Sequence, residues 1–531
     1  MAITASRRWE LPNPFARLIT DQNYMWWVSV PVMLGMFVVI IDSSIINVAL
    51  APIMAAFGSS VEDIEWVSTG YMLSAAVMMP TTGFLGDRFG RKKLYALTIF
   101  LFTIFSMMCG AAWSTGSLVF FRVMQGIAGG AIQPIGQSIM FEAFPPNKRG
   151  ISMALVGLGA MFAPMIGPTL GGYLVDYLNW RWIFYINLIP GMLATFLVLT
   201  IVRESKLRTV KFDLWGFASM AIFLSTFLLG ISQGNTKGWH SYYIVGLFAV
   251  AAVAFGLFLI VEFWNEDPVV DLTLFKYRTY TAGTLASVAM GIGLFGGLFI
   301  LPLFLQNLMG LDALQTGLLM MPSGLAMGVV MPISGAILDR VDPRFPLILG
   351  LGLMSFSLFL QSTMTPETSY WTVVGWTMLR SMGMAFAFPA MNQTALGAVP
   401  IKKIGQASGL FNVVRQVGGS FGIAILSTIL TQRQVFHSQI LGQAMKGVMA
   451  GAAMHGFQGM LMAHGSNMVE AQQQAGLIFG MFATKQAVVQ AFQDGFWVAG
   501  MIALIGSIPS LFITRDPEHY KSHGSSPMMV E

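Results

Sequence analysis

Four ionisable side chains lie deep inside long apolar stretches of the sequence: Asp42, Arg122, Arg380 and Arg415. An ionisable group within a membrane-spanning helix is energetically expensive and is a functional candidate by default. Low dielectric opposes ionisation of a carboxylate, whereas a nearby arginine favours it. A carboxylate on which these two effects nearly cancel can take up or release a proton as its surroundings change. This is the chemistry that a proton-coupled protein needs.

Asp42 and Arg122 are predicted to lie at the same depth. Asp42 follows the expected start of its helix by about sixteen residues, which is about 24 Å at 1.5 Å per residue. Arg122 lies about five residues into a helix of the opposite direction, about 22 Å up a core of about 30 Å. The two side chains can face one cavity, so we expect Asp42, with Arg122 beside it, to be the proton-coupling site. The alternative is a static ion pair that joins two helices.

The substrate cavity has four candidate residues: Arg380, Arg415, Asn47 and Gln133. Each of the two arginines could bind an anionic group. Each could equally be a packing residue that hydrogen-bonds neighbouring backbone or amide side chains.

The composition of the chain indicates a membrane protein, in which such residues would lie within membrane-spanning helices. The chain has 531 residues, of which 55% are hydrophobic and only 10% charged, against roughly 25% charged in soluble domains. The apolar residues fall in runs of about 20, the length that crosses a bilayer as a helix. The single cysteine, Cys109, excludes an internal disulfide and a cysteine-cluster metal site. The fold class is therefore an all-α membrane protein without a metal or cofactor.

Fourteen segments are predicted to span the membrane, with both termini in the cytoplasm. In this arrangement, 21 of the 29 lysines and arginines lie on the cytoplasmic side, five outside and three within helices. The asymmetry agrees with the positive-inside rule. The net charge of +5 follows this distribution and does not indicate nucleic-acid binding. The predicted segments are 26–51, 65–84, 94–113, 117–141, 150–173, 182–202, 212–232, 241–263, 281–305, 315–337, 346–364, 370–394, 407–430 and 492–513.

An internal repeat divides the chain. The pattern P-x-x-G-x-x-x-D-R occurs from Pro80 to Arg88 and again from Pro332 to Arg340. Weak internal symmetry of this kind is typical of secondary transporters. We predict a cytoplasmic tail, an N-terminal six-helix bundle, two inserted helices with their loops, a C-terminal six-helix bundle with a long outer loop at 431–491, and a second cytoplasmic tail. Their ranges are 1–25, 26–205, 206–277, 278–514 and 515–531.

The first copy of the repeat has a mechanical interpretation. Gly83 and Gly86 allow another helix to approach closely, and Asp87 can face the positive N-terminal end of that helix. The alternative is that the basic residues only set the topology. We expect a conformational latch made by the loop residues Gly83, Gly86, Asp87, Arg88, Gly90 and Arg91.

Several motifs resemble the major facilitator superfamily, and within it the fourteen-helix drug:proton antiporter branch of the EmrB/QacA type. They are Ile41 to Leu50, Gly83 to Lys93, Arg122-Val123-Met124-Gln125-Gly126, Ala163 to Gly172, and Asn412 to Gly419. The resemblance implies two six-helix bundles with two inserted helices, and contact between the latch and the helix that begins near Gly405. It also implies that an antiporter motif on the fifth helix comprises Pro164, Gly167, Pro168, Gly171 and Gly172.

The resemblance implies a proton-coupled multidrug efflux transporter of the bacterial inner membrane, which exports amphipathic or toxic compounds by alternating access. Its partners would be small amphipathic substrates, protons and the lipid bilayer. In Gram-negative relatives a periplasmic membrane-fusion adaptor and an outer-membrane channel join them, and the long outer loop would be a natural docking surface. The alternative is a dedicated metabolite, lipid or fatty-acid exporter on the same fold. We find no nucleotide-binding loop or catalytic constellation in the sequence, so an enzyme is not expected.

Overall fold

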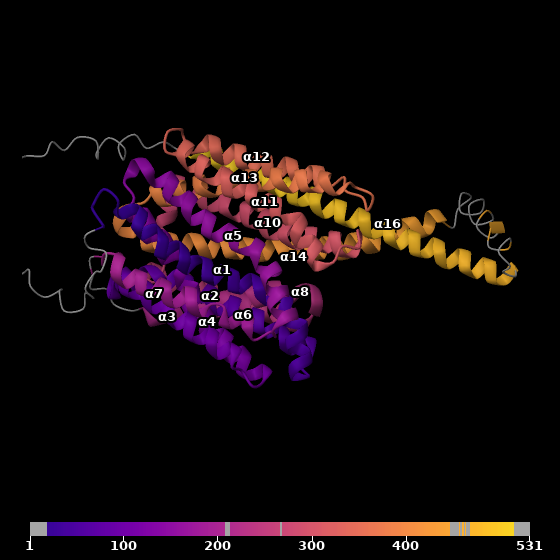
Figure 1. The fold of residues 1–531 in the computed structure, drawn as a ribbon, viewed down its shortest axis with the longest axis horizontal. Coiled ribbons are helices and arrows are strands. Elements are labelled where there is room, and N and C mark those ends of the chain that lie inside the picture. Colours follow the sequence, from indigo (N-terminus) through magenta and orange to yellow (C-terminus); the bar gives the residue numbers. More distant parts are fainter. Residues whose placement is uncertain are drawn as a thin grey trace, which may run out of the picture.

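The computed structural model describes residues 18–205, 207, 213–265, 268–445, 456, 459–460, 462 and 468–513. Across this part of the chain every regular element is a helix, and the long helices run roughly along one axis (Figure 1). Eleven of the described helices are long and apolar enough to cross a membrane. In chain order, the first seven α-helices of the structure are α1 (Tyr24–Phe57), α2 (Val61–Phe89), α3 (Arg91–Gly110), α4 (Thr115–Ala143), α5 (Arg149–Tyr177), α6 (Trp182–Tyr185) and α7 (Leu188–Ile201).

The remaining helices form the inserted pair and the second half. They are α8 (Leu214–Lys237), α9 (Tyr242–Trp264), α10 (Arg278–Asn307), α11 (Ala313–Leu338), α12 (Arg344–Gln361), α13 (Tyr370–Gly397), α14 (Ile404–Met445) and α16 (Met468–Ile505). A helix occupies each of the fourteen segments predicted to span the membrane. Because α2, α5 and α13 are not among the eleven that meet the length and hydropathy criteria, fourteen crossings remain a prediction.

Polar residues in the connections set where several helices begin. Ser60, Ser114, Asp213, Ser241 and Asp312 each accept a hydrogen bond from a backbone N–H in the first turn of the following helix. Such caps satisfy donors that the helix itself leaves unpaired. The apolar runs therefore have defined starts, although their composition alone gives only approximate ones.

Two predicted segments differ in extent from the helices found. The predicted outer loop at 431–491 is helical at both ends, because α14 continues to Met445 and α16 begins at Met468. The two extensions project beyond the rest of the bundle (Figure 1). We call this the hairpin end, and the opposite end, where α1 begins and α16 finishes, the terminal end. Residues 1–17 of the predicted N-terminal tail, the whole predicted C-terminal tail and most of 446–467 lie outside the described residues.

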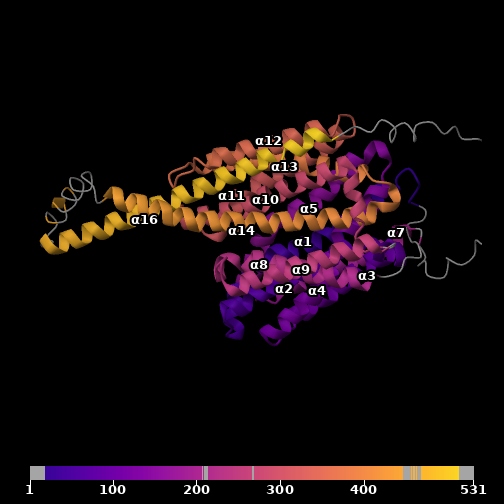
Figure 2. The same ribbon diagram turned by 180° about the vertical axis from the view of Figure 1, so that it is seen from behind.

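The two halves meet along four helix pairs. Helix α5 packs against α11 and α13, and α14 packs against α2 and α4. The inserted helix α8 contacts α9, α2 and α14, so it lies over the line where the halves meet (Figure 2). This arrangement places α1 and α4 in one half, and α10, α13 and α14 in the other, around the centre of the bundle.

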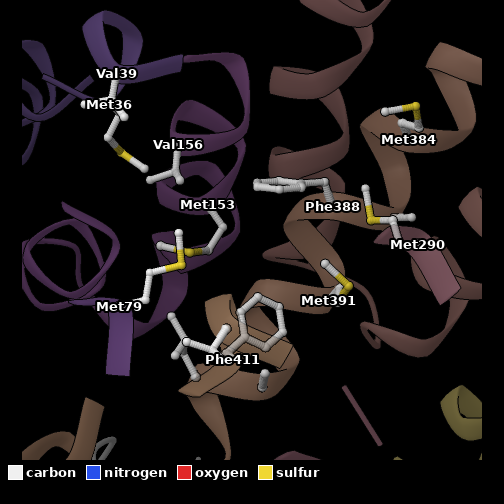
Figure 3. Packing of buried hydrophobic residues seen from close by; sticks show 14 of the residues in the cluster. Met36, Val39, Met79, Met153, Val156, Met290, Met384, Phe388, Met391 and Phe411 are labelled. Carbon is white, nitrogen blue, oxygen red and sulfur yellow. The ribbon is translucent and has the colours of Figure 1, made fainter. Parts of the chain in front are cut away.

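Methionine and phenylalanine side chains fill the centre between the halves (Figure 3). Met36 and Met153 come from one half, and Met290, Phe388 and Phe411 from the other. Gly157 on α5 makes room there, since a methyl group added to it would lie 2.8 Å from the Phe388 ring. Unbranched, polarizable methionine side chains adapt to neighbours of different shape. The contact between the halves is thus apolar and deformable.

Candidate functional site

The carboxylate of Asp42 is the centre of the buried polar network in the first half. Its side chain is 1% exposed. Arg122 Nη1 donates to Asp42 Oδ2 at 2.6 Å, Gln125 Nε2 donates to Oδ1 at 3.0 Å, and Asn187 Nδ2 donates to Oδ1 at 2.8 Å. Two donors from α4 and one from a helix junction therefore surround one carboxylate on α1.

Arg122 is held from several sides. Its Nε donates to the carbonyl oxygen of Val67 at 3.1 Å, and its Nη1 also donates to Gln125 Oε1 at 2.7 Å. The guanidinium carbon lies 4.2 Å from the ring centre of Tyr71, within the range of a cation–π contact. The arginine thus joins α4 to α1 and α2 at one level, as the predicted depths of Asp42 and Arg122 indicated.

The third donor, Asn187, lies where the predicted segment 182–202 is interrupted. The segment divides into α6 and α7, and Asn187 lies at the junction between them. Asn187 Nδ2 also donates to Ser106 Oγ at 3.0 Å, and Ser106 donates to the Phe184 carbonyl at 2.9 Å. An asparagine in an otherwise apolar run was the signal for this residue, but sequence reasoning did not select it.

Gln125 and Tyr71 were also missed as site residues. Gln125 follows Arg122 by three residues, so the two side chains share one face of α4. That spacing could have identified it. Nothing in the sequence around Tyr71 distinguishes it from the other aromatic residues of the apolar helices.

The arrangement can hold or release a proton only after a structural change. Asp42 and Arg122 are both 1% exposed, so neither is in contact with bulk water in this conformation. The carboxylate oxygens are already occupied by donors. Protonation of Asp42 would remove its attraction for Arg122 and would therefore loosen the contact between α1 and α4.

A second polar network connects the two halves directly. Gln137 Oε1 on α4 accepts hydrogen bonds from Asn412 Nδ2 at 2.8 Å and from Ser408 Oγ at 3.1 Å, both on α14. Arg415 Nη2 donates to Gln133 Oε1 at 3.2 Å and to Asn412 Oδ1 at 2.7 Å. The structure therefore brings together two of the predicted cavity residues, Gln133 and Arg415.

The other two predicted cavity residues lie elsewhere. Arg380 on α13 is 4% exposed and packs against Gly297 of α10. Asn47 is exposed on α1, one turn beyond the exposed Ser43 in the direction of the hairpin end. Neither is joined to the Arg415 network by a hydrogen bond in the described chain.

The predicted latch makes a close contact between α2 and the start of α14. A methyl group added to Gly83 would lie 2.5 Å from the backbone nitrogen of Gln406, so only glycine permits this approach. Arg91 forms an ion pair with Glu142 and lies near Asp87, at 3.5 Å between Arg91 Nη2 and Asp87 Oδ1. The contact with the helix that begins near Gly405 is therefore present.

The other latch residues have different surroundings. Gly90 has φ +88°, a conformation that favours glycine, and its neighbour Glu204 accepts the backbone N–H groups of Lys92 and Lys93 at the start of α3. Arg88 is exposed and lies 5.6 Å from the ring centre of Phe89. Arg88 forms no ion pair with any described residue.

The second copy of the repeat makes a matching contact. Asp339 Oδ1 accepts the backbone N–H of Gly150 at 2.6 Å, and Oδ2 accepts that of Ile151 at 3.2 Å. These are the first N–H groups of α5, which carry partial positive charge. Burial raises the pKa of Asp339, and the two N–H groups oppose that rise. An acid of the second half thus caps a helix of the first at the terminal end.

The glycines of the predicted α5 motif have mixed roles. A methyl group on Gly167 would lie 2.6 Å from Ser44 Oγ, and one on Gly171 would lie 2.6 Å from Ile45, so both permit close packing of α5 on α1. Gly172 has open space around it. The side chains of Pro164 and Pro168 lie outside the described residues.

Within the described ranges, we find no group of three or more His, Cys, Asp or Glu residues that could hold a metal ion.

Comparisons with known proteins agree on one family. A sequence model of the Major Facilitator Superfamily matches residues 32–423. The chain is 32% identical over 413 residues to the uncharacterized MFS-type transporter YhcA of Bacillus subtilis, covering 77% of each chain. It is 30% identical to the multidrug export protein EmrB of Escherichia coli, covering 90% of this chain and 93% of EmrB. A crystal structure of XylE double-tryptophan mutants aligns with TM-score 0.61 at 12% identity, covering 93% of this chain and 96% of XylE.

The buried Asp42–Arg122 ion pair is expected to contribute to the free energy of unfolding. Asp42→Asn leaves Arg122 as an uncompensated buried charge, so we expect the free energy of unfolding to fall by about 3–5 kcal/mol. Adding Arg122→Gln should recover part of that loss, since the uncompensated charge is then removed. Thermal unfolding of the purified single and double variants measures this coupling.

The exposed pair Lys237–Glu62, at 2.9 Å, is the matched control. Its coupling energy should be much smaller than that of the buried pair, because solvent screens exposed charges. Additive effects of Asp42→Asn and Arg122→Gln would contradict a structurally important buried pair.

Proposed function

The chain belongs to the major facilitator superfamily, and we propose that it is a proton-coupled multidrug exporter that moves amphipathic or toxic compounds out of the cell by alternating access. Membership of this family supports the prediction that the chain is a transporter rather than an enzyme. Relatives named for multidrug resistance or export, EmrB among them, cover most of the chain and support the substrate class. The location we propose is the bacterial inner membrane.

The observation that carries the coupling proposal is the burial of Asp42 with Arg122. It is a carboxylate in the interior of the first half, and its counter-ion lies on a different helix. An intramembrane carboxylate of this kind is a natural proton carrier. When Asp42 is ionised, the ion pair draws α1 and α4 together. When Asp42 is protonated, that attraction is lost and the two helices can separate.

We place the terminal end in the cytoplasm. Arg91, Lys92, Lys93, Lys148 and Arg149 gather at that end of the bundle, and basic residues are retained on the cytoplasmic side. In this orientation the Gly83–Gln406 contact and the Asp339 cap close the cytoplasmic end. The polar side chains of Ser43 and Asn47 are exposed on α1 toward the outside. These features support assignment of the conformation to an outward-facing state.

Alternating access then requires the cytoplasmic contacts to break. The hydrogen bonds described above between the halves run from Asp339 at the terminal end to Arg415 in the interior of α14. We infer that a proton entering from outside reaches Asp42, releases Arg122, and loosens α4 from its hydrogen bonds to α14. Helix α4 carries Arg122, Gln133 and Gln137 along one continuous helix, so its movement can transmit this change.

We further propose that the extended helices at the hairpin end dock a periplasmic adaptor. Helix α14 has 42 residues, or about 63 Å, about twice the thickness of the hydrocarbon core. Asp494 on α16 binds both His437, at 2.8 Å, and Arg433, at 3.3 Å, on α14, which joins the two helices near the root of the hairpin. Apolar side chains are exposed beyond it at Val435, Phe436, Ile440, Leu477, Met481 and Phe482.

The coupling proposal is tested with inside-out vesicles and an imposed pH gradient. We expect the native chain to accumulate an exported dye in a gradient-dependent way, and Asp42→Asn to reduce this by about tenfold or more, because asparagine takes no proton. Glu62→Gln, an exposed acid outside the network, should transport normally. Dye binding by purified Asp42→Asn shows whether the variant is folded.

Each outcome of this experiment has a different meaning. If transport needs the gradient but not Asp42, the coupling site lies elsewhere. If transport by the native chain does not depend on the pH gradient, the exporter is not driven by protons.

The latch is tested by the distance across the cytoplasmic end. Asp339→Asn removes the charge and one of the two acceptors from the start of α5, so the closed state should lose about 1–3 kcal/mol and the open population should rise. Spin labels on the exposed residues Asn147 and Arg340, in a Cys109→Ser chain, report this opening as longer distances in pulsed electron resonance. Asp342→Asn, in the same loop with its partner Arg344 in its own half, is the control. An unchanged distribution in Asp339→Asn would contradict a latch.

The adaptor proposal is tested by comparing transport in vesicles, which needs the chain alone, with the drug resistance of intact cells, which would also need the adaptor. We expect Phe436→Glu with Phe482→Glu to abolish drug resistance of Gram-negative cells, because charged side chains would disrupt an apolar contact. Vesicle transport by the same variant should remain. The control is Tyr242→Glu, an exposed aromatic at the start of α9. Full resistance in the double variant would exclude this surface as the docking site.

A further inference from the structure

The interruption between α6 and α7 coincides with a buried amide. Helix α6 ends at Tyr185 and α7 begins at Leu188, so Asn187 lies in the connection between them. The backbone N–H of Asn187 donates to the carbonyl of Phe184, three residues earlier, at 3.3 Å. Such a bond belongs to a tighter turn than that of an α-helix. The side chain of Asn187 is 1% exposed, so the turn carries its amide into the interior of the first half.

The side-chain nitrogen of Asn187 serves two acceptors. It donates to Asp42 Oδ1 at 2.8 Å and to Ser106 Oγ at 3.0 Å. The Ser106 hydroxyl donates in turn to the Phe184 carbonyl at 2.9 Å. An amide nitrogen carries two hydrogens, and both are engaged here. The contact between Asp42 and Asn187 therefore belongs to a hydrogen-bonded chain that ends on the backbone of α6.

Helix α3 fixes this connection in place. Ser106 lies on α3, and a methyl group added to Gly191 of α7 would overlap Thr103 Oγ1 of α3. On the other side of the connection, Arg181 Nη1 donates to the carbonyls of Gly110 and Ala112, at 2.7 Å in each case. The position of the amide is thus set by α3, whereas the other two donors to the carboxylate come from α4.

The charge of Asp42 has three titratable neighbours. Arg122 on α4, Tyr71 on α2 and Cys109 on α3 interact with it electrostatically. Tyrosine and cysteine side chains carry no charge near neutral pH, so the arginine is the charged one of the three.

The remaining helices that pack against α1 differ in this respect. Helix α7 contains no titratable residue, and those of α5 lie near its two ends. Tyr185 of α6 lies against Gly110 of α3. The connection between α6 and α7 therefore acts on the carboxylate through the neutral amide of Asn187.

We propose that Asn187 is a positioning residue for the proton-coupling carboxylate, so that the pH range of coupling depends on α3 and on the connection between α6 and α7. A hydrogen bond to an ionised acceptor is stronger than one to a neutral acceptor, so this donor favours the ionised carboxylate. Movement of α6 and α7 away from α1 withdraws the donor and favours proton uptake. This inference rests on the proposed coupling role of Asp42 and adds a second helix connection to it.

The test follows protonation by infrared difference spectroscopy of the full chain in nanodiscs. The carbonyl stretch of a protonated carboxyl that disappears in Asp42→Asn belongs to Asp42, and its intensity is recorded across pH. We expect Asn187→Leu to move the midpoint of this titration upward by about one pH unit, a tenfold change in proton affinity, because the ionised form loses a charge-assisted hydrogen bond. An unmoved midpoint, or an Asp42 signal absent at every pH in both chains, would overturn the proposal.

A second variant at the same position separates positioning from packing. Asn187→Asp has nearly the shape of the native residue but replaces the donor with another carboxylate. We expect a larger upward shift than in Asn187→Leu, because like charges oppose ionisation and the two acids titrate as a pair. A residue that only fills space predicts the reverse order, since aspartate disturbs the packing less than leucine. That reverse order would contradict the proposal.

Two further variants calibrate the shift. Thr195→Val removes a buried hydroxyl from α7 that donates to the Gly191 carbonyl of the same helix at 2.9 Å, and it should leave the midpoint unchanged. Ser106→Ala keeps the three donors to Asp42 but removes the group that holds Asn187, so we expect a smaller upward shift than in Asn187→Leu. A shift in Thr195→Val as large as that in Asn187→Leu would assign the effect to lost packing and overturn the proposal.

Transport by the same variants distinguishes this inference from the proposed function. In inside-out vesicles, the pH profile of dye transport by Asn187→Leu should move in the same direction as the infrared midpoint. If the midpoint moves but transport needs no pH gradient, the proposed coupling function is wrong and the positioning role stands. If transport needs both the gradient and Asp42 but the midpoint does not move, the positioning role is wrong and the proposed exporter stands.

Discussion

The arrangement of the first half depends on the satisfaction of one buried negative charge. Asp42 lies where water does not reach, so every acceptor position must be met by the protein itself. Arg122, Gln125 and Asn187 meet them from α4 and from the α6–α7 junction. The same contacts determine the height of α4, the break before α7 and the packing of α1. The residue that we propose as the proton carrier is thus also the residue that joins α1 to α4 and to the α6–α7 junction.

The two halves share a repeat but differ in charge. At the terminal end the symmetry is kept: the α2 copy meets the start of α14, and Asp339 meets the start of α5. In the interior it is broken, because Arg122 faces an acid and Arg380 faces a glycine. Among the described residues, Arg122 has a carboxylate partner and Arg380 has none.

The contact between the halves combines two kinds of surface. Methionine and phenylalanine side chains fill the centre and can adapt to different neighbours (Figure 3). Directional hydrogen bonds that Asn412 and Ser408 donate to Gln137 lie beside them and exist in one geometry only. A soft apolar contact tolerates rearrangement, whereas a buried polar network is either formed or broken. This combination suits a protein that moves between two discrete states.

Hydropathy and charge in the sequence were enough to predict a helical membrane protein with helices at fourteen positions, an internal repeat, and a common depth for Asp42 and Arg122. Each of these depends on distance along the chain, which a helix converts directly into height. Which side chains meet was decided only by the tertiary structure. Asn187 reaches Asp42, Arg380 meets no acid, and Asp339 caps α5, because these contacts depend on how each helix is rotated about its axis and which helix of the other half it faces. Neither quantity is encoded by the spacing of residues within one helix.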